Sequence, residues 1–118
     1  MKRLDTTLLM TDLDGTLLPS TKEILPEELE AIRQFRQQGG KFAIATGRTL
    51  QAAQRYLDRV QADVPVILFN GAGIYDPLSG TMLDTESLPA EAAFQMTRQV
   101  LEAFPEVSAE ILRADGTY

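Results

Sequence analysis

The sequence contains no cysteine and no histidine among its 118 residues. The absence of cysteine excludes disulfide bridges, thiolate zinc sites and cysteine nucleophiles. The absence of histidine excludes Ser–His and Cys–His catalysis and histidine-ligated metals in this chain. Any chemistry must therefore rest on carboxylates, hydroxyls, amides, lysine and arginine.

Basic charge is also scarce, with 11 Lys and Arg residues against 17 Asp and Glu residues and a net charge of −6. The second half, residues 61–118, carries only two basic side chains against nine acidic ones. An acidic chain without a basic stripe argues against nucleic acid and anionic membranes as partners. We therefore expect any anionic substrate to be held locally, by a metal ion or by backbone amides.

Long apolar runs are missing too. The first five residues carry no apolar signal core, and no run approaches the ~20 residues of a membrane span. The expected location is therefore the cytoplasm. Apolar residues make up 44% and charged residues 24% of the chain, as in an ordinary globular domain or part of one.

Apolar runs alternate with amphipathic segments through the first 69 residues. Pro26 and Gly39-Gly40 mark the ends of a first helix, and the second helix presents an apolar face from Leu50 to Val60. This pattern predicts a parallel α/β sheet with right-handed crossovers, its strands near residues 8–10, 42–45 and 66–69. We expect the first strand to be buried, because it is apolar on both faces.

The remaining chain has a different pattern. A hairpin is expected from residues 74–76 and 81–84, then a helix over about residues 89–103, a strand over residues 107–113 and a turn at residues 114–117. The helix is expected to turn five apolar side chains inward: Ala93, Met96, Val100, Leu101 and Phe104.

Two carboxylates follow the first predicted strand. Ligands bind at the carboxyl ends of strands in open α/β sheets, and residues two apart on a strand face the same side. Asp12 and Asp14 can therefore face one site, where they suit Mg²⁺ and could supply a nucleophile and a proton donor. The alternative is that Asp12–Gly15 form only a turn.

Two further groups follow the second and third strands. Thr46, Gly47 and Arg48 precede a helix N-terminus and offer a hydroxyl, close backbone approach and a guanidinium for phosphate oxygens. A capped helix start with an exposed arginine is the alternative. Asn70 is interpreted mainly as a turn residue, with contact to substrate or to Asp12 as the other option. Lys22 and Lys41 are interpreted as solvated surface lysines.

These motifs resemble those of the haloacid dehalogenase superfamily, in particular its Cof-type sugar phosphatases with a type II cap. The resemblance covers the whole chain and implies a Rossmann-like core over residues 1–84 and the beginning of an α+β cap over residues 85–118. It implies a hydrolase of small phosphorylated metabolites that uses Mg²⁺. The implied roles are nucleophile and metal ligand for Asp12, proton donor and backbone metal ligand for Asp14, phosphoryl contact for Thr46, and substrate orientation for Arg48.

The resemblance also indicates an N-terminal fragment, because the family's third-motif Lys and fourth-motif Gly-Asp have no counterpart before Tyr118. Three alternatives remain: a phosphomutase, an inactive fragment and a response-regulator receiver, which needs an aspartate where Asn70 stands. In a fragment the first strand would have an open edge. We therefore expect that the chain self-associates through residues 7–12, is only partly folded, or is held by a complementary fragment.

Overall fold

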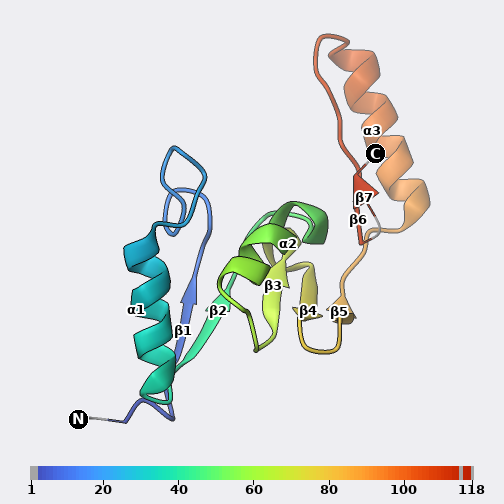
Figure 1. The fold of residues 1–118 in the computed structure, drawn as a ribbon. Coiled ribbons are helices and arrows are strands. Elements are labelled where there is room, and N and C mark those ends of the chain that lie inside the picture. The colour runs from blue at the N-terminus through green and yellow to red at the C-terminus, as the bar shows by residue number, and fades with distance from the viewer. Residues whose placement is uncertain (1–2, 115, 118) are drawn as a thin grey trace.

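The computed structural model describes residues 3–114 and 116–117. Figure 1 shows the helices and strands of this part of the chain. Their bounds are β1 (Leu8–Thr11), α1 (Pro26–Gln37), β2 (Lys41–Ile44), α2 (Leu50–Arg59), β3 (Val66–Leu68), the short 3₁₀ turn η1 (Phe69–Gly71), β4 (Gly73–Asp76), β5 (Thr81–Thr85), α3 (Ala90–Ala103), β6 (Leu112–Arg113) and β7 (Gly116–Thr117).

The first three strands run parallel, as the sequence predicts. β1 pairs with β2 in a register that places Leu9 opposite Phe42, and a parallel bridge between Ala45 and Ile67 joins the end of β2 to β3. β3 then pairs antiparallel with β4, and β4 with β5. The α/β class and the predicted hairpin are confirmed, and the antiparallel pairing makes this a mixed arrangement.

The core lies between the sheet and the two helices that cross between its strands. Ile32 of α1 is buried, and Ala53, Tyr56 and Leu57 of α2 are almost inaccessible to solvent. Burial of this kind contributes roughly 1.5–3 kcal/mol for each large apolar side chain. Because α2 has the apolar face that the sequence predicts, it holds the loop at its own N-terminus in a defined place.

The prediction that β1 is buried is wrong. Leu8, Leu9 and Met10 are 56%, 49% and 41% exposed. β1 pairs only with β2, and no other strand in the described residues borders its outer edge. Its apolar side chains therefore lack the cover that an all-apolar strand requires.

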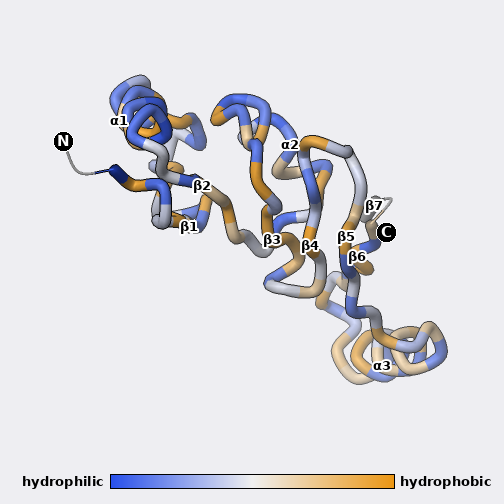
Figure 2. The backbone as a smooth tube through the Cα atoms, turned by 90° about the horizontal axis from the view of Figure 1, so that it is seen from below, coloured by the Kyte–Doolittle hydropathy of each residue, from blue (hydrophilic) through white to orange (hydrophobic). Residues whose placement is uncertain are grey.

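The prediction that α3 packs inward is also wrong. Met96, Val100, Leu101 and Phe104 are all exposed, and α3 buries no residue. Figures 1 and 2 show α3 standing apart from the sheet, with apolar residues along its length. The helix forms with nearly the predicted bounds, but none of its side chains is buried by another part of the described chain.

The end of the chain differs from the expected strand. Only Leu112 and Arg113 form β6, which pairs antiparallel with β7, so residues 107–111 are irregular. The predicted turn includes Asp115, which lies outside the described residues. The domain boundary at residue 84 falls within β5 and stays a prediction. Over the described residues no helix is both long and apolar enough to cross a membrane.

Candidate active site

Three loops meet where β1, β2 and β3 end. The Ala45 N–H donates to the Thr11 carbonyl (2.8 Å), and the Thr46 N–H donates to the Ile67 carbonyl (2.9 Å). The Asn70 N–H in turn donates to the Thr46 carbonyl (3.1 Å). These bonds join the three strand ends, so the predicted site residues lie on adjoining loops as the parallel topology requires.

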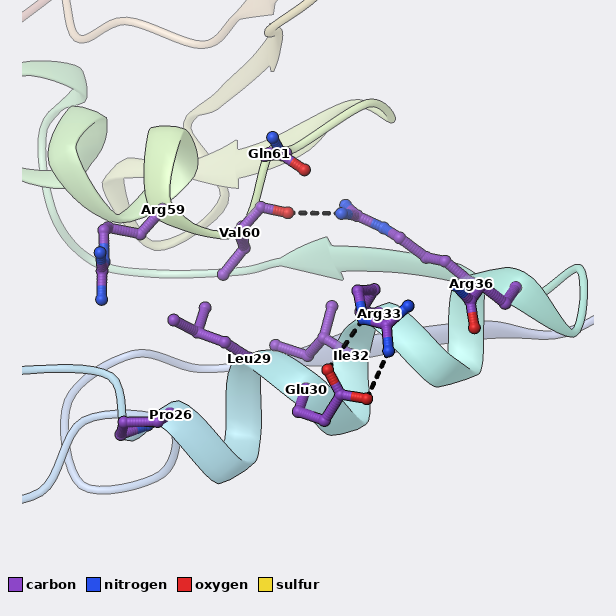
Figure 3. A pocket seen from close by; sticks show the side chains of 10 residues that line it. Pro26, Leu29, Glu30, Ile32, Arg33, Arg36, Arg59, Val60 and Gln61 are labelled. Carbon is purple, nitrogen blue, oxygen red and sulfur yellow. Dashed lines mark hydrogen bonds and ion pairs between the residues drawn. The ribbon is translucent and has the colours of Figure 1, made fainter.

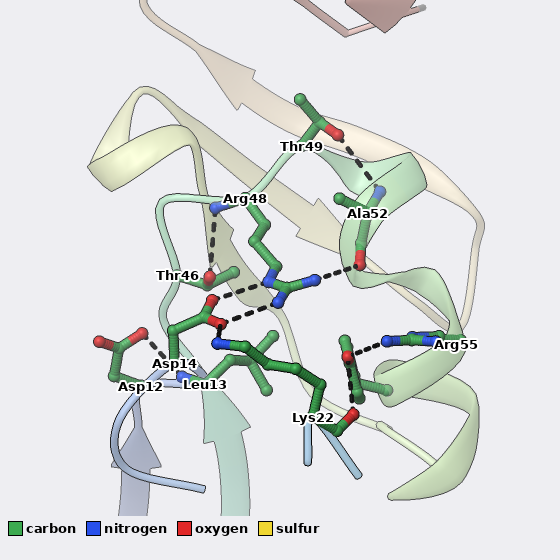
Figure 4. Close-up of polar contacts among 10 residues, drawn as sticks. Asp12, Leu13, Asp14, Lys22, Thr46, Arg48, Thr49, Ala52 and Arg55 are labelled. Carbon is green, nitrogen blue, oxygen red and sulfur yellow. Dashed lines mark hydrogen bonds and ion pairs between the residues drawn. The ribbon is translucent and has the colours of Figure 1, made fainter. Parts of the chain in front are cut away.

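The Asp14 carboxylate is held by two cations from different parts of the chain (Figure 4). The Arg48 guanidinium binds it in a bidentate manner, with Nε donating to Oδ2 and Nη2 donating to Oδ1, each at 2.8 Å. Lys22 Nζ donates to Oδ1, also at 2.8 Å. Arg48 and Asp14 are thus brought together as predicted. Lys22 is exposed, as the sequence indicates, and in addition pairs with Asp14, which the sequence does not indicate.

These contacts lower the pKa of Asp14. The hydrogen bond from Arg48, followed by that from Lys22, holds the pKa of the Asp14 carboxyl far below its ordinary value. The same pairing raises the pKa of the Arg48 guanidinium. Asp14 is therefore a carboxylate at neutral pH, and both of its oxygens already accept hydrogen bonds.

Asp12 has different partners. Its Oδ1 accepts the Leu13 N–H at 2.7 Å, and its side chain makes no hydrogen bond or ion pair with any cation of the described residues. Figure 4 shows the Asp12 carboxylate on the side of Asp14 away from Arg48. The two carboxylates are neighbours in the chain, but only Asp14 is neutralised by cations.

The donors suit a hard divalent cation only in part. Mg²⁺ prefers oxygen ligands and keeps several waters, and the Asp12 carboxylate fits that preference. Nowhere in residues 3–114 or 116–117 do three acidic side chains gather to hold a metal ion. These residues therefore provide a partial ligand set, with Asp12 as its carboxylate.

The loop after β2 is shaped by close contacts. The buried Thr46 accepts the Arg48 N–H on its Oγ1 at 3.1 Å, and Thr49 caps α2 by accepting the Ala52 N–H at 3.2 Å. A Cβ on Gly47 would lie 2.6 Å from Asn70 Oδ1, so any larger residue there would require the Asn70 side chain to shift. The loop thereby fixes the position from which Arg48 reaches Asp14.

The loop after β3 has an unusual backbone. Phe69 and Asn70 both have left-handed φ values, 53° and 55°, which non-glycine residues adopt rarely. The Phe69 N–H donates to the Arg48 carbonyl at 3.1 Å. Asn70 thus forms the expected turn and packs against Gly47, and no hydrogen bond connects it to Asp12 in the described residues.

Sequence reasoning missed the anchoring of Lys22. Its φ of 60° is also left-handed, its N–H donates to the Pro19 carbonyl (2.9 Å), and its carbonyl accepts the Tyr56 hydroxyl (3.0 Å). Arg55 Nη2 donates to the same hydroxyl. Pro19 and its neighbours indicate a turn, but no periodic pattern indicates where the lysine would point.

A cleft of about 540 Å³ lies away from these loops, between α1 and the end of α2 (Figure 3). No predicted site residue lines it. Arg36 crosses this cleft, donating to the Val60 carbonyl and pairing with Asp63 at 3.3 Å. This arginine joins the two helices, so the cleft is a packing feature away from the strand ends.

The structure therefore defines an α/β protein with an Asp-x-Asp pair and an arginine at the carboxyl ends of parallel strands. The family model of haloacid dehalogenase-like hydrolases matches residues 9–118. The chain belongs to this family, which confirms the resemblance seen in the motifs.

Relatives agree with this assignment. Pyridoxal phosphate phosphatase YbhA of Escherichia coli is 34% identical over 97 residues, covering 82% of this chain and 36% of YbhA. Phosphatase BT1666 of Bacteroides thetaiotaomicron superposes with a TM-score of 0.76 at 27% identity, over 94% of this chain and 40% of that one. The subclass IIB sugar phosphatase BT4131 shares the fold, with a TM-score of 0.75 at 24% identity over 94% and 42%. The chain spans about a third of the length of the curated relatives it matches.

Proposed function

We propose that the protein hydrolyses phosphomonoesters of small metabolites, with Asp12 as nucleophile and Asp14 as proton donor. The contrast between the two carboxylates is the observation that carries the proposal. Asp14 is held by Arg48 and Lys22, whereas Asp12 meets no cation of the described residues. A carboxylate without a competing cation is free to attack phosphorus. Phosphatase names among the relatives support the same reaction class.

The proposed reaction proceeds in two displacements. An Asp12 oxygen forms a bond to phosphorus while the bond from phosphorus to the leaving oxygen breaks, and that oxygen takes a proton from Asp14. Water then attacks the phosphoryl group and gives its proton to Asp14. The bond between phosphorus and Asp12 breaks, which releases inorganic phosphate and restores both carboxyl groups.

The ion pair of Asp14 must open before this sequence can begin. A carboxylate whose two oxygens accept from Arg48 and Lys22 carries no proton to donate. Weakening these contacts raises the pKa of Asp14 toward its ordinary value. A phosphorylated substrate offers the two cations another oxyanion. Asp14, released beside the negative charge of the substrate, then takes up a proton from solvent, and this is the proton that it gives to the leaving oxygen.

The other site residues have supporting roles in this proposal. The Thr46 hydroxyl has a proton to donate to a phosphoryl oxygen while its oxygen accepts from Arg48 N–H. Arg48 orients the substrate through its guanidinium group. Asp12 would be the carboxylate ligand of Mg²⁺, and the bound ion would supply neutralisation of phosphoryl charge.

The test is the substitution Asp12→Asn in the full-length protein, assayed on p-nitrophenyl phosphate with Mg²⁺. An amide cannot form the acyl phosphate, so turnover should fall by up to ~10⁶, as for other essential nucleophiles. Asp84→Asn makes the same charge change at an exposed position of β5 and should keep full activity. Retention of more than a few per cent of turnover by Asp12→Asn would contradict the assignment.

A further inference from the structure

Lys22 stands at the site although it comes from a loop that no motif marks. Its ammonium group donates to Asp14 Oδ1 at 2.8 Å, the same oxygen that accepts from Arg48 Nη2. Lys22 precedes α1 in the sequence and Arg48 follows it, and the two cations share one carboxylate oxygen (Figure 4). Ion pairs of this kind need only one cation to balance the charge.

The second cation leaves a local excess of positive charge. Lys22 and Arg48 both pair with Asp14, so this pairing carries two positive charges against one negative charge. The chain as a whole has a net charge of −6. A positive cluster in an acidic chain favours an anionic ligand at that point.

The backbone at Lys22 supports a functional role. Its φ of 60° is left-handed, a conformation that costs a non-glycine residue roughly 1–2 kcal/mol and that glycine adopts freely. A lysine that served only as a turn residue would be better replaced by glycine. Strained residues of this kind gather at functional sites, where the side chain is needed.

We propose that Lys22 is a substrate-binding residue that forms, with Arg48, a two-cation cradle for a phosphate-class oxyanion, and that Asp14 occupies this cradle until the substrate replaces it. This inference rests on the proposed function for its substrate class. The carboxylate oxygens of Asp14 take three N–H donors at 2.8 Å, a geometry that phosphate oxygens share. The Tyr56 hydroxyl donates to the Lys22 carbonyl and so holds the backbone from which the Lys22 side chain reaches Asp14.

Binding of inorganic phosphate tests the cradle without requiring turnover. Phosphate is titrated into the chain while calorimetry gives the dissociation constant and NMR follows the ¹⁵N signals of Lys22 Nζ and Arg48 Nε. Lys22→Met should weaken phosphate binding about fivefold, the factor expected for one exposed ion pair. Lys41→Met removes the same charge at an exposed position on β2 and should change nothing.

Asp14→Asn gives a result in the opposite direction. Removing the internal anion frees the cradle, so phosphate should bind more tightly than to the unaltered chain. A merely structural Asp14 would give unchanged or weaker binding. The proposal is overturned if phosphate fails to shift the two ¹⁵N signals, if Lys22→Met behaves like Lys41→Met, or if Asp14→Asn leaves phosphate binding unchanged or weakens it.

Lys22→Gly separates backbone from side chain. Glycine suits the left-handed φ, so the free energy of unfolding should stay the same or rise while phosphate binding weakens as in Lys22→Met. If Lys22→Gly keeps full phosphate affinity, the ammonium group is not part of the cradle. Because these measurements need no catalysis, they can fail while Asp12→Asn still abolishes turnover, and the reverse also holds.

Kinetics in the full-length protein identify the oxyanion. If the cradle takes the transferring phosphoryl group, Lys22→Met lowers kcat/KM on p-nitrophenyl phosphate. If it takes a second anionic group of the substrate, kcat/KM falls only for a sugar bisphosphate. Both outcomes support the cradle, whereas an unchanged kcat/KM for both substrates overturns it.

Discussion

Removing one buried hydroxyl should both destabilise the protein and loosen Lys22. Tyr56 is 1% exposed, and its hydroxyl donates to the Lys22 carbonyl at 3.0 Å and accepts from Arg55. Phenylalanine keeps the ring in place, so Tyr56→Phe removes the two hydrogen bonds without leaving a large cavity. The change is therefore a direct test of the link between α2 and the loop that carries Lys22.

The expected loss follows from the surroundings of the two partners. A hydrogen bond contributes about 0.5–1.5 kcal/mol net, and more when its loss leaves a buried group without a partner. Lys22 and Arg55 are exposed residues, so water can replace the hydroxyl at both. We therefore expect Tyr56→Phe to lower the free energy of unfolding by about 1 kcal/mol, which is the lower end of the range for the loss of two hydrogen bonds.

Urea unfolding followed by circular dichroism measures this loss. Tyr75→Phe is the matched control, because Tyr75 is also buried but its hydroxyl makes no hydrogen bond within the described residues. The control should change the free energy of unfolding by less than about 0.5 kcal/mol, as is usual away from specific contacts. If Tyr56→Phe costs no more than Tyr75→Phe, the hydroxyl does not anchor Lys22.

Two further predictions concern acid stability and association. Arg48 and Lys22 lower the pKa of Asp14 from 3.8, so their stabilisation is present above pH 3.8 and is lost as pH falls through the lowered pKa. Urea titrations at a series of pH values below 3.8 should show that the free energy of unfolding falls more steeply with falling pH for the unaltered chain than for Asp14→Asn. Equal slopes of this free energy against pH would contradict the pairing. Because β1 has an open apolar edge, the chain should self-associate, and Leu9→Lys should reduce the mass found by light scattering. A chain that is already monomeric would refute this.

The convergence of Asp14 and Arg48 could be predicted because the topology requires it. Each residue follows a parallel strand, and parallel strands place their carboxyl ends at one edge. Apolar runs, Pro26 and the paired glycines Gly39 and Gly40 were enough to define those strands and the helix between them. The site therefore followed from element order, which is the feature of a sequence that hydrophobic patterns indicate best.

The burial of β1 and α3 could not be predicted in the same way. α2 and α3 both have apolar faces, but Leu57 of α2 is 2% exposed while Phe94 of α3 is 59% exposed. A pattern reports the chemical character of a face, and burial requires a second surface to meet it. Leu9 of β1 illustrates the same point, since an apolar strand without a covering layer stays open to solvent.

Lys22 was missed for a different reason, which also explains why it is informative. Its position depends on one left-handed dihedral angle and on the Tyr56 hydroxyl, and neither produces a repeating pattern in the sequence. Asp14 is assigned to the site by its place after β1, yet the pKa of its carboxyl is lowered by this unpredicted lysine as well as by Arg48. Lys22 adopts a left-handed φ that lysine disfavours, and it contacts a carboxylate that Arg48 already neutralises. A second anion that binds there best explains both features. The Lys22→Gly substitution addresses that explanation directly. It relieves the left-handed backbone and removes the charge, so phosphate binding should weaken while the free energy of unfolding stays the same or rises.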